Sequence, residues 1–233
     1  MRRWREDDRE PFAAMNADPE VMRYFPAPLD RAASDALVDR IEDLFGRQGF
    51  GLWALEVAGP EPASTQPAGP EPAGPESATP EPASPEPASA GGFIGFTGLN
   101  PMPPGVPGAG GLEVGWRLAR HAWHHGYATE AATAAAGVAF EGAGLAEIWS
   151  MTAAANVPSQ AVMRRLGMTL HTRFDHPAIE AGHPLRPHVA YRLARSSPPG
   201  WRSAPRHGSP HRSRVGTSVP SRHIPSENQE ISR

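Results

Sequence analysis

The segment "LEVGWRLARHAWHHGYATEA", residues 112–131, decides the fold of this chain. Residues 112–118 alternate as a strand does, and a turn then leads to Gly126, where an alanine-rich helix is predicted over about 127–142. The first N–H groups of a helix have no intrahelical acceptor and lie at the positive end of its dipole. We therefore expect the backbone of this turn to bind a phosphate group.

The histidines of the turn raise the alternative of a metal site. A helical zinc motif needs two histidines four residues apart with a carboxylate base between them. The residues between His121 and His125 are Ala122, Trp123 and His124, none of which carries a carboxylate. The sequence therefore predicts no metal ion, and the turn is assigned to phosphate binding.

Composition excludes several kinds of chemistry. The chain of 233 residues has no cysteine, and its 22 basic residues are all arginine. A thiolate nucleophile, a disulfide, a sulfur-ligated zinc ion and a lysine Schiff base are thus excluded. The N-terminus has no apolar segment of a signal peptide, and the net charge of −3 does not indicate a nucleic-acid or membrane partner. We expect a cytoplasmic protein.

Two segments differ in composition from the remainder. Residues 58–92 repeat a Pro-Glu-Pro-Ala theme, which predicts a disordered insertion in the hairpin between strands at about 50–57 and 93–99. Residues 196–233 carry six arginines against two glutamates and predict a disordered basic tail. The ordered domain is expected over 1–195. An inert insertion is favoured over a docking arm, and an inert tail over a ribosome-binding one.

The remaining elements predict a mixed sheet with helices on both faces. Helices are expected over 7–16 and 34–47, with Ser34 capping the second, and over about 158–166. Further strands are expected over 148–152 and 189–193. Gly167 is expected to end the third helix as its C′ residue.

Four segments in this order resemble the GNAT N-acetyltransferases, and in particular their RimJ/RimL-type branch. They are "DPEVMRY" (18–24), "WHHGYATEA" (123–131), "NVPSQAVMRRLGM" (156–168) and "FDHPAIEAGHPLRPHVAYRL" (174–193). The second is similar to the family's acyl-CoA loop, Q/R-x-x-G-x-G/A, with Trp123 in the place of Gln or Arg.

The resemblance implies the GNAT fold, an α/β (α+β) architecture. Its mixed, mostly antiparallel sheet is splayed between strands 4 and 5, has helices on both faces, and would carry the insertion in its strand 2–3 hairpin. His124 and His125 stand where related sequences commonly carry Gly and Arg, so a positive φ at position 124 would be strained. The family's first strand would be clipped at this N-terminus.

The resemblance also implies a cosubstrate, acetyl-CoA, and the residues that bind it. By this resemblance the pantetheine arm would fill the splay, and backbone N–H groups near 114–118 would polarise the thioester carbonyl. The residues expected to contact acetyl-CoA are Trp116, Leu118, His124, His125, Gly126, Tyr127, Ala128, Thr129 and Asn156.

Catalytic and substrate roles follow by the same resemblance. Glu113 would draw a proton from the acceptor amine, and Ser159 would protonate the leaving thiolate; the alternatives are a solvated strand residue and a first-turn residue after an Asn156 cap. Three histidines, which are otherwise ordinary surface residues, would border the acceptor site: His176, His183 and His188.

The resemblance therefore implies an N-acetyltransferase that moves an acetyl group to a primary amine by direct attack. The acceptor is a protein N-terminus or a small-molecule amine, and the protein is expected to be a monomer or homodimer. Two alternatives remain: a catalytically impaired CoA-binding module and a ribosome-associated binding protein.

Overall fold

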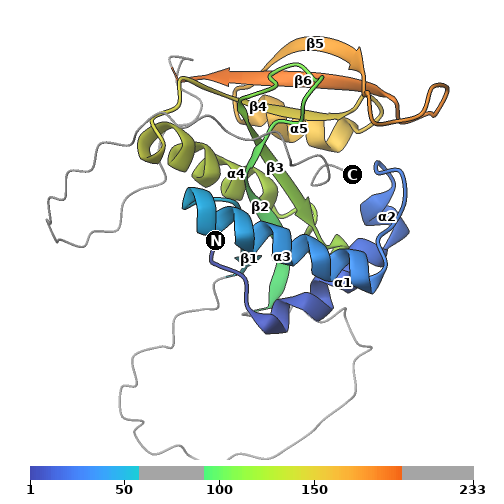
Figure 1. The fold of residues 1–233 in the computed structure, drawn as a ribbon, viewed down its shortest axis with the longest axis vertical. Helices are drawn as coiled ribbons and strands as arrows, with labels where there is room; N and C mark the ends of the chain where they lie inside the picture. The colour runs from blue at the N-terminus through green and yellow to red at the C-terminus, as the bar shows by residue number, and fades with distance from the viewer. Residues whose placement is uncertain (58–91, 196–233) are drawn as a thin grey trace, which may run out of the picture.

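A computed structural model describes residues 1–57 and 92–195 of the chain (Figure 1). The predictions of a disordered insertion over 58–92 and of a disordered basic tail over 196–233 concern residues that, apart from Gly92, lie outside these ranges. Strands β1 and β2 flank the insertion and pair as an antiparallel hairpin from Leu52 opposite Gly98 to Glu56 opposite Phe93. The two strands on either side of residues 58–91 thus form a hairpin.

A six-stranded sheet in the order β1-β2-β3-β4-β6-β5 organises the described residues. Every neighbouring pair is antiparallel except β3 and β4, which run parallel. The predicted mixed, mostly antiparallel sheet is therefore confirmed. The strands are β1 Leu52–Glu56, β2 Phe93–Pro101, β3 Leu112–Leu118, β4 Glu147–Ala153, β5 Thr169–Asp175 and β6 Pro187–Ala194.

The parallel pair is the point where the sheet opens. β3 and β4 are in register only at Glu113 and Trp149, whereas β2 pairs with β3 along the whole length of β3. A parallel pair normally has evenly spaced hydrogen bonds along both strands. A single paired position means that β3 and β4 diverge, which is the splay predicted from the sequence.

Helices cover both faces of the sheet. α1 Arg9–Ala17 and α3 Arg31–Gln48 lie side by side, and their apolar faces pack on Leu52, Ala54 and Phe96 (Figure 1). On the opposite face, alanines of α4 Tyr127–Gly137 and the apolar face of α5 Val157–Arg165 pack on β3 and β4. The small side chains let α4 approach β3 closely, as the alanine-rich sequence suggests.

The start of α3 differs from the prediction. Asp30 caps this helix, because its Oδ1 accepts a hydrogen bond from the N–H of Ala33 at 2.8 Å. Ser34 is fully buried inside the first turns, and its hydroxyl accepts a hydrogen bond from Asn16 Nδ2 at 2.9 Å. Ser34 therefore joins α3 to α1 rather than capping α3.

Glycines with positive φ end two of the helices. Gly49 has a φ of 77° and ends α3, and Gly167 has a φ of 80° just after α5. The N–H of Met168 donates to the carbonyl of Met163 at 3.0 Å, so the predicted C′ role of Gly167 is confirmed. α4 continues into a π-helical turn over Val138–Gly142.

The structure also contains elements that the sequence patterns did not reveal. These are β5 at the edge of the sheet, the four-residue helix α2 Pro19–Met22, and an antiparallel bridge between Arg2 and Ala54 beside β1. Within 1–57 and 92–195, no helix is long and apolar enough to cross a membrane.

Candidate functional site

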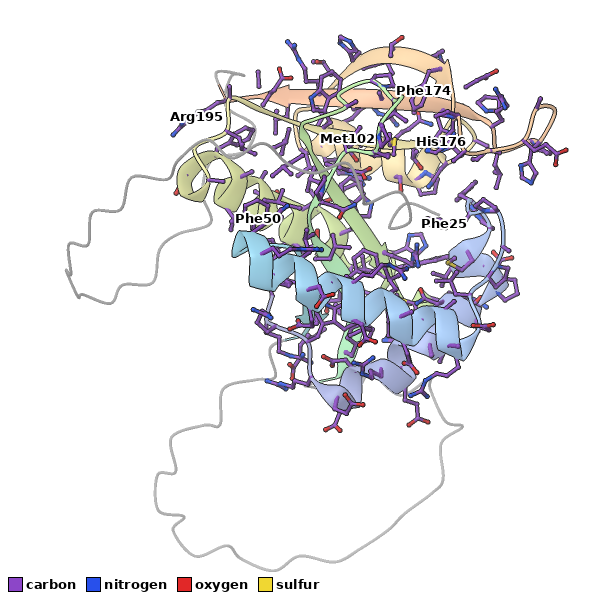
Figure 2. The ribbon with its side chains drawn as sticks, in the orientation of Figure 1. Phe25, Phe50, Met102, Phe174, His176 and Arg195 are labelled. Atoms are coloured by element: carbon purple, nitrogen blue, oxygen red, sulfur yellow. The ribbon has the colours of Figure 1, made fainter. Side chains whose placement is uncertain are left out.

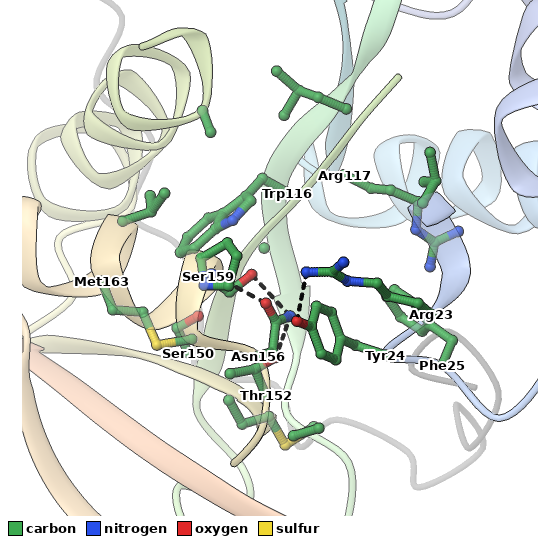
Figure 3. A pocket seen from close by; sticks show the side chains of 18 of the residues that line it. Arg23, Tyr24, Phe25, Trp116, Arg117, Ser150, Thr152, Asn156, Ser159 and Met163 are labelled. Carbon is green, nitrogen blue, oxygen red and sulfur yellow. Dashed lines mark hydrogen bonds between the residues drawn. The ribbon is translucent and has the colours of Figure 1, made fainter. Parts of the chain in front are cut away.

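A cavity of about 1370 Å³ lies where β3 and β4 diverge (Figure 3). β3, β4, the first turns of α4 and α5, and the segment after α2 contribute its walls. His125 and His183, both expected at the site, do not line it. The other residues expected there do line it: Glu113, Trp116, Leu118, His124, Gly126, Tyr127, Ala128, Thr129, Asn156, Ser159, His176 and His188.

The N-terminus of α4 presents unpaired backbone donors to this cavity. Gly126 precedes the helix with a φ of 85°, and no side chain caps the first turn. The N–H groups of Tyr127 and Ala128 donate to no described residue, whereas those of Thr129 and Glu130 bond to the Gly126 carbonyl at 3.0 and 3.1 Å. This arrangement of free N–H groups at the positive end of a helix suits a phosphate group.

His124 is the strained residue of this loop. Its φ of 66° is the one positive φ at a non-glycine position in the described ranges. Histidine adopts this region more readily than most residues, but at some cost in free energy. The strain anticipated from the sequence is therefore present. His125 is exposed and stacks on the ring of Tyr127 with 5.4 Å between centroids.

The N-terminus of α5 brings Asn156 and Ser159 together (Figure 3). Asn156 caps the helix, since its Oδ1 accepts from the N–H of Ser159 at 3.2 Å. Its Nδ2 donates to the Ser159 hydroxyl at 3.1 Å and to Thr152 Oγ1 at 2.9 Å. The Ser159 oxygen thus accepts a hydrogen bond from Asn156, which leaves its own proton available to a group in the cavity.

Glu113 stands at the closed end of the splay. Its Oε1 accepts a hydrogen bond from the N–H of Met151 on β4 at 3.2 Å. Burial raises the pKa of Glu113 to about 7, and this hydrogen bond lowers it to a lesser extent. A carboxylate with a pKa near neutrality is suited to accept a proton at physiological pH.

Two histidines that line the cavity lie next to each other. The rings of His176 and His188 are both buried and lie 4.8 Å apart between centroids. Figure 2 shows His176 beside Phe174, and the two rings are 6.2 Å apart. Burial lowers the pKa of His188, which favours the neutral form of its ring. His183 instead accepts a hydrogen bond from the N–H of Leu185 at 3.1 Å within its own turn.

Arg117 is a cavity residue that the motifs did not single out. Its guanidinium donates to Asn16 Oδ1 at 2.6 Å and lies over the ring of Phe25, 4.1 Å from the centroid. Burial lowers the pKa of Arg117 to about 10, so it still carries its charge at pH 7. The period of two along β3 could have revealed it, because Arg117 faces the same side as Glu113.

The described ranges contain no group of three or more His, Cys, Asp or Glu side chains placed to hold a metal ion. What the cavity offers is a helix terminus for phosphate, a gap between strands, a near-neutral carboxylate and a hydroxyl. These features suit an acyltransferase.

The family follows from a sequence comparison. The family model described as an acetyltransferase (GNAT) domain matches residues 1–169, and the chain belongs to the GNAT acetyltransferases. Over 102 residues it is 36% identical to FsC-acetyl coenzyme A-N(2)-transacetylase of Aspergillus fumigatus, a match that covers 40% of this chain and 43% of the relative. The chain thus spans less than half the length of this curated relative.

Solved structures show the same fold. Ribosomal-protein-alanine N-acetyltransferase from Brucella melitensis aligns with a TM-score of 0.55 and 15% identity, over 83% of this chain and 98% of that one. Spermidine N-acetyltransferase from Vibrio cholerae, in complex with CoA and spermine, aligns with a TM-score of 0.56 and 14% identity, over 84% and 95%. At such identities these likenesses establish the fold alone.

Proposed function

We propose that the protein transfers the acetyl group of acetyl-CoA to a primary amine by direct attack. The observation that carries this proposal is the convergence, in one cavity, of the uncapped α4 terminus, Glu113 and Ser159. The name of the Aspergillus relative, which includes acetyl coenzyme A, supports this cosubstrate. The cytoplasmic location stays a prediction from the sequence.

The residues present fit acetyl-CoA. The free N–H groups of Tyr127 and Ala128 would hold its pyrophosphate, and the divergence of β3 and β4 leaves room for an extended pantetheine arm. Trp116 and Leu118 line the cavity on the side of β3 that faces α4. We therefore assign cosubstrate binding to the α4 side of the strand.

The transfer step uses two side chains. Glu113 takes a proton from the acceptor ammonium, and the amine nitrogen then attacks the thioester carbon, forming the C–N bond. The C–S bond breaks next, the hydroxyl of Ser159 gives its proton to the CoA thiolate, and the nitrogen loses its second proton to solvent. Solvent returns a proton to Ser159 and removes the one on Glu113. The products are the acetylated amine and CoA.

The pKa of the acceptor amine sets the free energy needed to deprotonate it at pH 7. An α-amine with a pKa of about 7.7–8.0 requires about 1 kcal/mol to be neutral at pH 7, whereas a lysine near 10.4 requires about 4.6 kcal/mol. A base with a pKa of about 7 is half-ionised at that pH. We therefore favour an α-amine, in a protein N-terminus or a small molecule, which agrees with the RimJ/RimL-type segments.

The test is a calorimetric titration of acetyl-CoA into the wild-type protein, Gly126→Trp and Gly182→Trp. Both glycines have a positive φ, 85° and 86°, and open space around a Cβ, but Gly182 lies outside the cavity. We expect micromolar binding by wild type and Gly182→Trp, and its loss in Gly126→Trp. Absence of binding by the wild-type protein would refute the proposal.

The strain at His124 favours a second candidate, a CoA-binding module without catalysis. It predicts the same titration result but no release of CoA in the presence of amines. Release of CoA that depends on an added amine would exclude it.

A further inference from the structure

On one face of β3, the carboxylate of Glu113 and the guanidinium of Arg117 lie on either side of a position without a side chain, Gly115. Glu113, Gly115 and Arg117 alternate along the strand and therefore project to the same side. Their partners directly across β2 are Asn100, Gly98 and Phe96. Between the two charged residues the sheet thus carries only the glycine pair.

The described residues leave room above Gly115. A Cβ built on this residue would meet no atom within 4 Å, and Gly115 lines the cavity. Glu113 and Arg117 are four residues apart, which corresponds to about 13 Å along a strand. A small elongated molecule can therefore lie over Gly115 with one end at each charge.

Arg117 is poorly satisfied by the protein around it. The residue is 8% exposed, and the guanidinium donates one hydrogen bond, from Nη1 to Asn16. Nε is buried without an acceptor, and no carboxylate of the described residues pairs with this side chain. Its other neighbours are the rings of Phe25 and Phe96, at 4.1 and 5.4 Å from the guanidinium carbon.

This environment of Arg117 lowers the stability of the folded protein unless a ligand accepts the remaining hydrogen bonds of the guanidinium. A buried charge is normally paired, and an unmet buried donor lowers stability. With Nη1 directed to Asn16 and Nε buried, Nη2 is the remaining nitrogen that can donate to a ligand in the cavity. A negatively charged oxygen, such as that of a carboxylate, would pair with the guanidinium there.

We propose that Arg117 binds a carboxylate of the acceptor, so that the acceptor is an amino acid or a short peptide. Its amine lies toward Glu113 and its carboxylate toward Arg117, with the backbone crossing over Gly115. This inference rests on the proposed acetyl transfer and specifies its substrate class.

The experiment compares acids with their amides. Glycine, diglycine and triglycine, each as the free acid and as the C-terminal amide, are offered with acetyl-CoA, and released CoA is followed by thiol titration. The proteins are wild type, Arg117→Met, which keeps the volume but removes the donors, and Arg173→Met, an exposed arginine on β5 outside the cavity.

We expect wild type and Arg173→Met to favour at least one acid over its amide by about tenfold or more in kcat/KM, because a charged hydrogen-bonded pair is lost with the amide. Arg117→Met should reduce this ratio to within about threefold of one. Equal use of acids and amides by wild type, or an unchanged ratio in Arg117→Met, would overturn the assignment while leaving acetyl transfer intact.

A binding measurement on the wild-type protein avoids dependence on the folding of the variant. In the presence of CoA, N-acetyldiglycine is expected to raise the unfolding midpoint more than N-acetyldiglycinamide does. Equal shifts would count against the carboxylate site. If no acid or amide is acetylated although acetyl-CoA binds, the proposed function itself fails, and this inference with it.

Discussion

Replacing Glu113 by Gln tests the central residue of the site in two independent ways. The amide keeps the shape of the side chain and can still accept the hydrogen bond from Met151, but it cannot ionise. In the fold the pKa of Glu113 rises from 4.5 to about 7. At about 1.36 kcal/mol per unit, the folded state opposes ionisation by about 3 kcal/mol.

The sign of the effect on stability follows from proton linkage. Because the folded state holds the proton more tightly, this residue lowers stability as the pH rises from about 4.5 through about 7. Glu113→Gln lacks this loss. The variant should therefore be more stable than wild type by at most about 3 kcal/mol at pH 8 and by less than about 1 kcal/mol at pH 5.

Urea unfolding at pH 5 and pH 8 measures this difference, since other groups titrate alike in both proteins and cancel. In parallel, the kcat/KM of wild type should rise with pH through about 7, the point at which Glu113 ionises. Glu113→Gln should lower kcat by about 10²–10⁴-fold, and its remaining rise of kcat/KM should follow the pKa of the acceptor amine, about 7.7–8.0, instead of about 7. A stability difference that does not depend on pH, or a variant that keeps the pH profile, would refute the reasoning.

Two further substitutions test the surroundings of the site. His124→Gly should raise the free energy of unfolding by up to about 1 kcal/mol, because glycine tolerates the positive φ at this position. The control is His125→Gly, at an exposed position with negative φ, which should not raise the free energy of unfolding. Thermal unfolding compares the two variants. Asn16→Ala should lower the free energy of unfolding by about 1–3 kcal/mol in urea, since Ser34 and Arg117 both lose their hydrogen bonds to a fully buried side chain; a neutral result would mean that water replaces Asn16.

The strands that the sequence predicted correctly are the ones that are buried. β3 alternates apolar and polar residues, and β4 and β6 carry apolar runs that pack in the core. β5 escaped prediction because it is an edge strand whose residues are exposed or half-buried, with Leu170 left 46% exposed. Hydrophobic periodicity reports burial, so a strand held mainly by its hydrogen bonds to a neighbour gives little signal.

The residues of the site also differ in whether the sequence could predict their contacts. Asn156 and Ser159 are three residues apart, and a local motif captures the geometry of their mutual hydrogen bonds. Arg117 depends on Asn16, which is 101 residues away along the chain. No local pattern encodes that contact, although the position of Arg117 two residues beyond Gly115 already placed it on the same face as Glu113.

In the proposed reaction, the alternation of β3 would let one strand serve two substrates. Trp116 and Leu118 face α4, whose terminus suits phosphate, whereas Glu113 and Arg117 face the side of α1 and the segment after α2. A cosubstrate and an acceptor approaching from opposite faces can meet only where the sheet is open, which is at the splay beyond Glu113. Direct transfer across that gap requires no covalent intermediate on the protein, and it therefore suits a chain without cysteine.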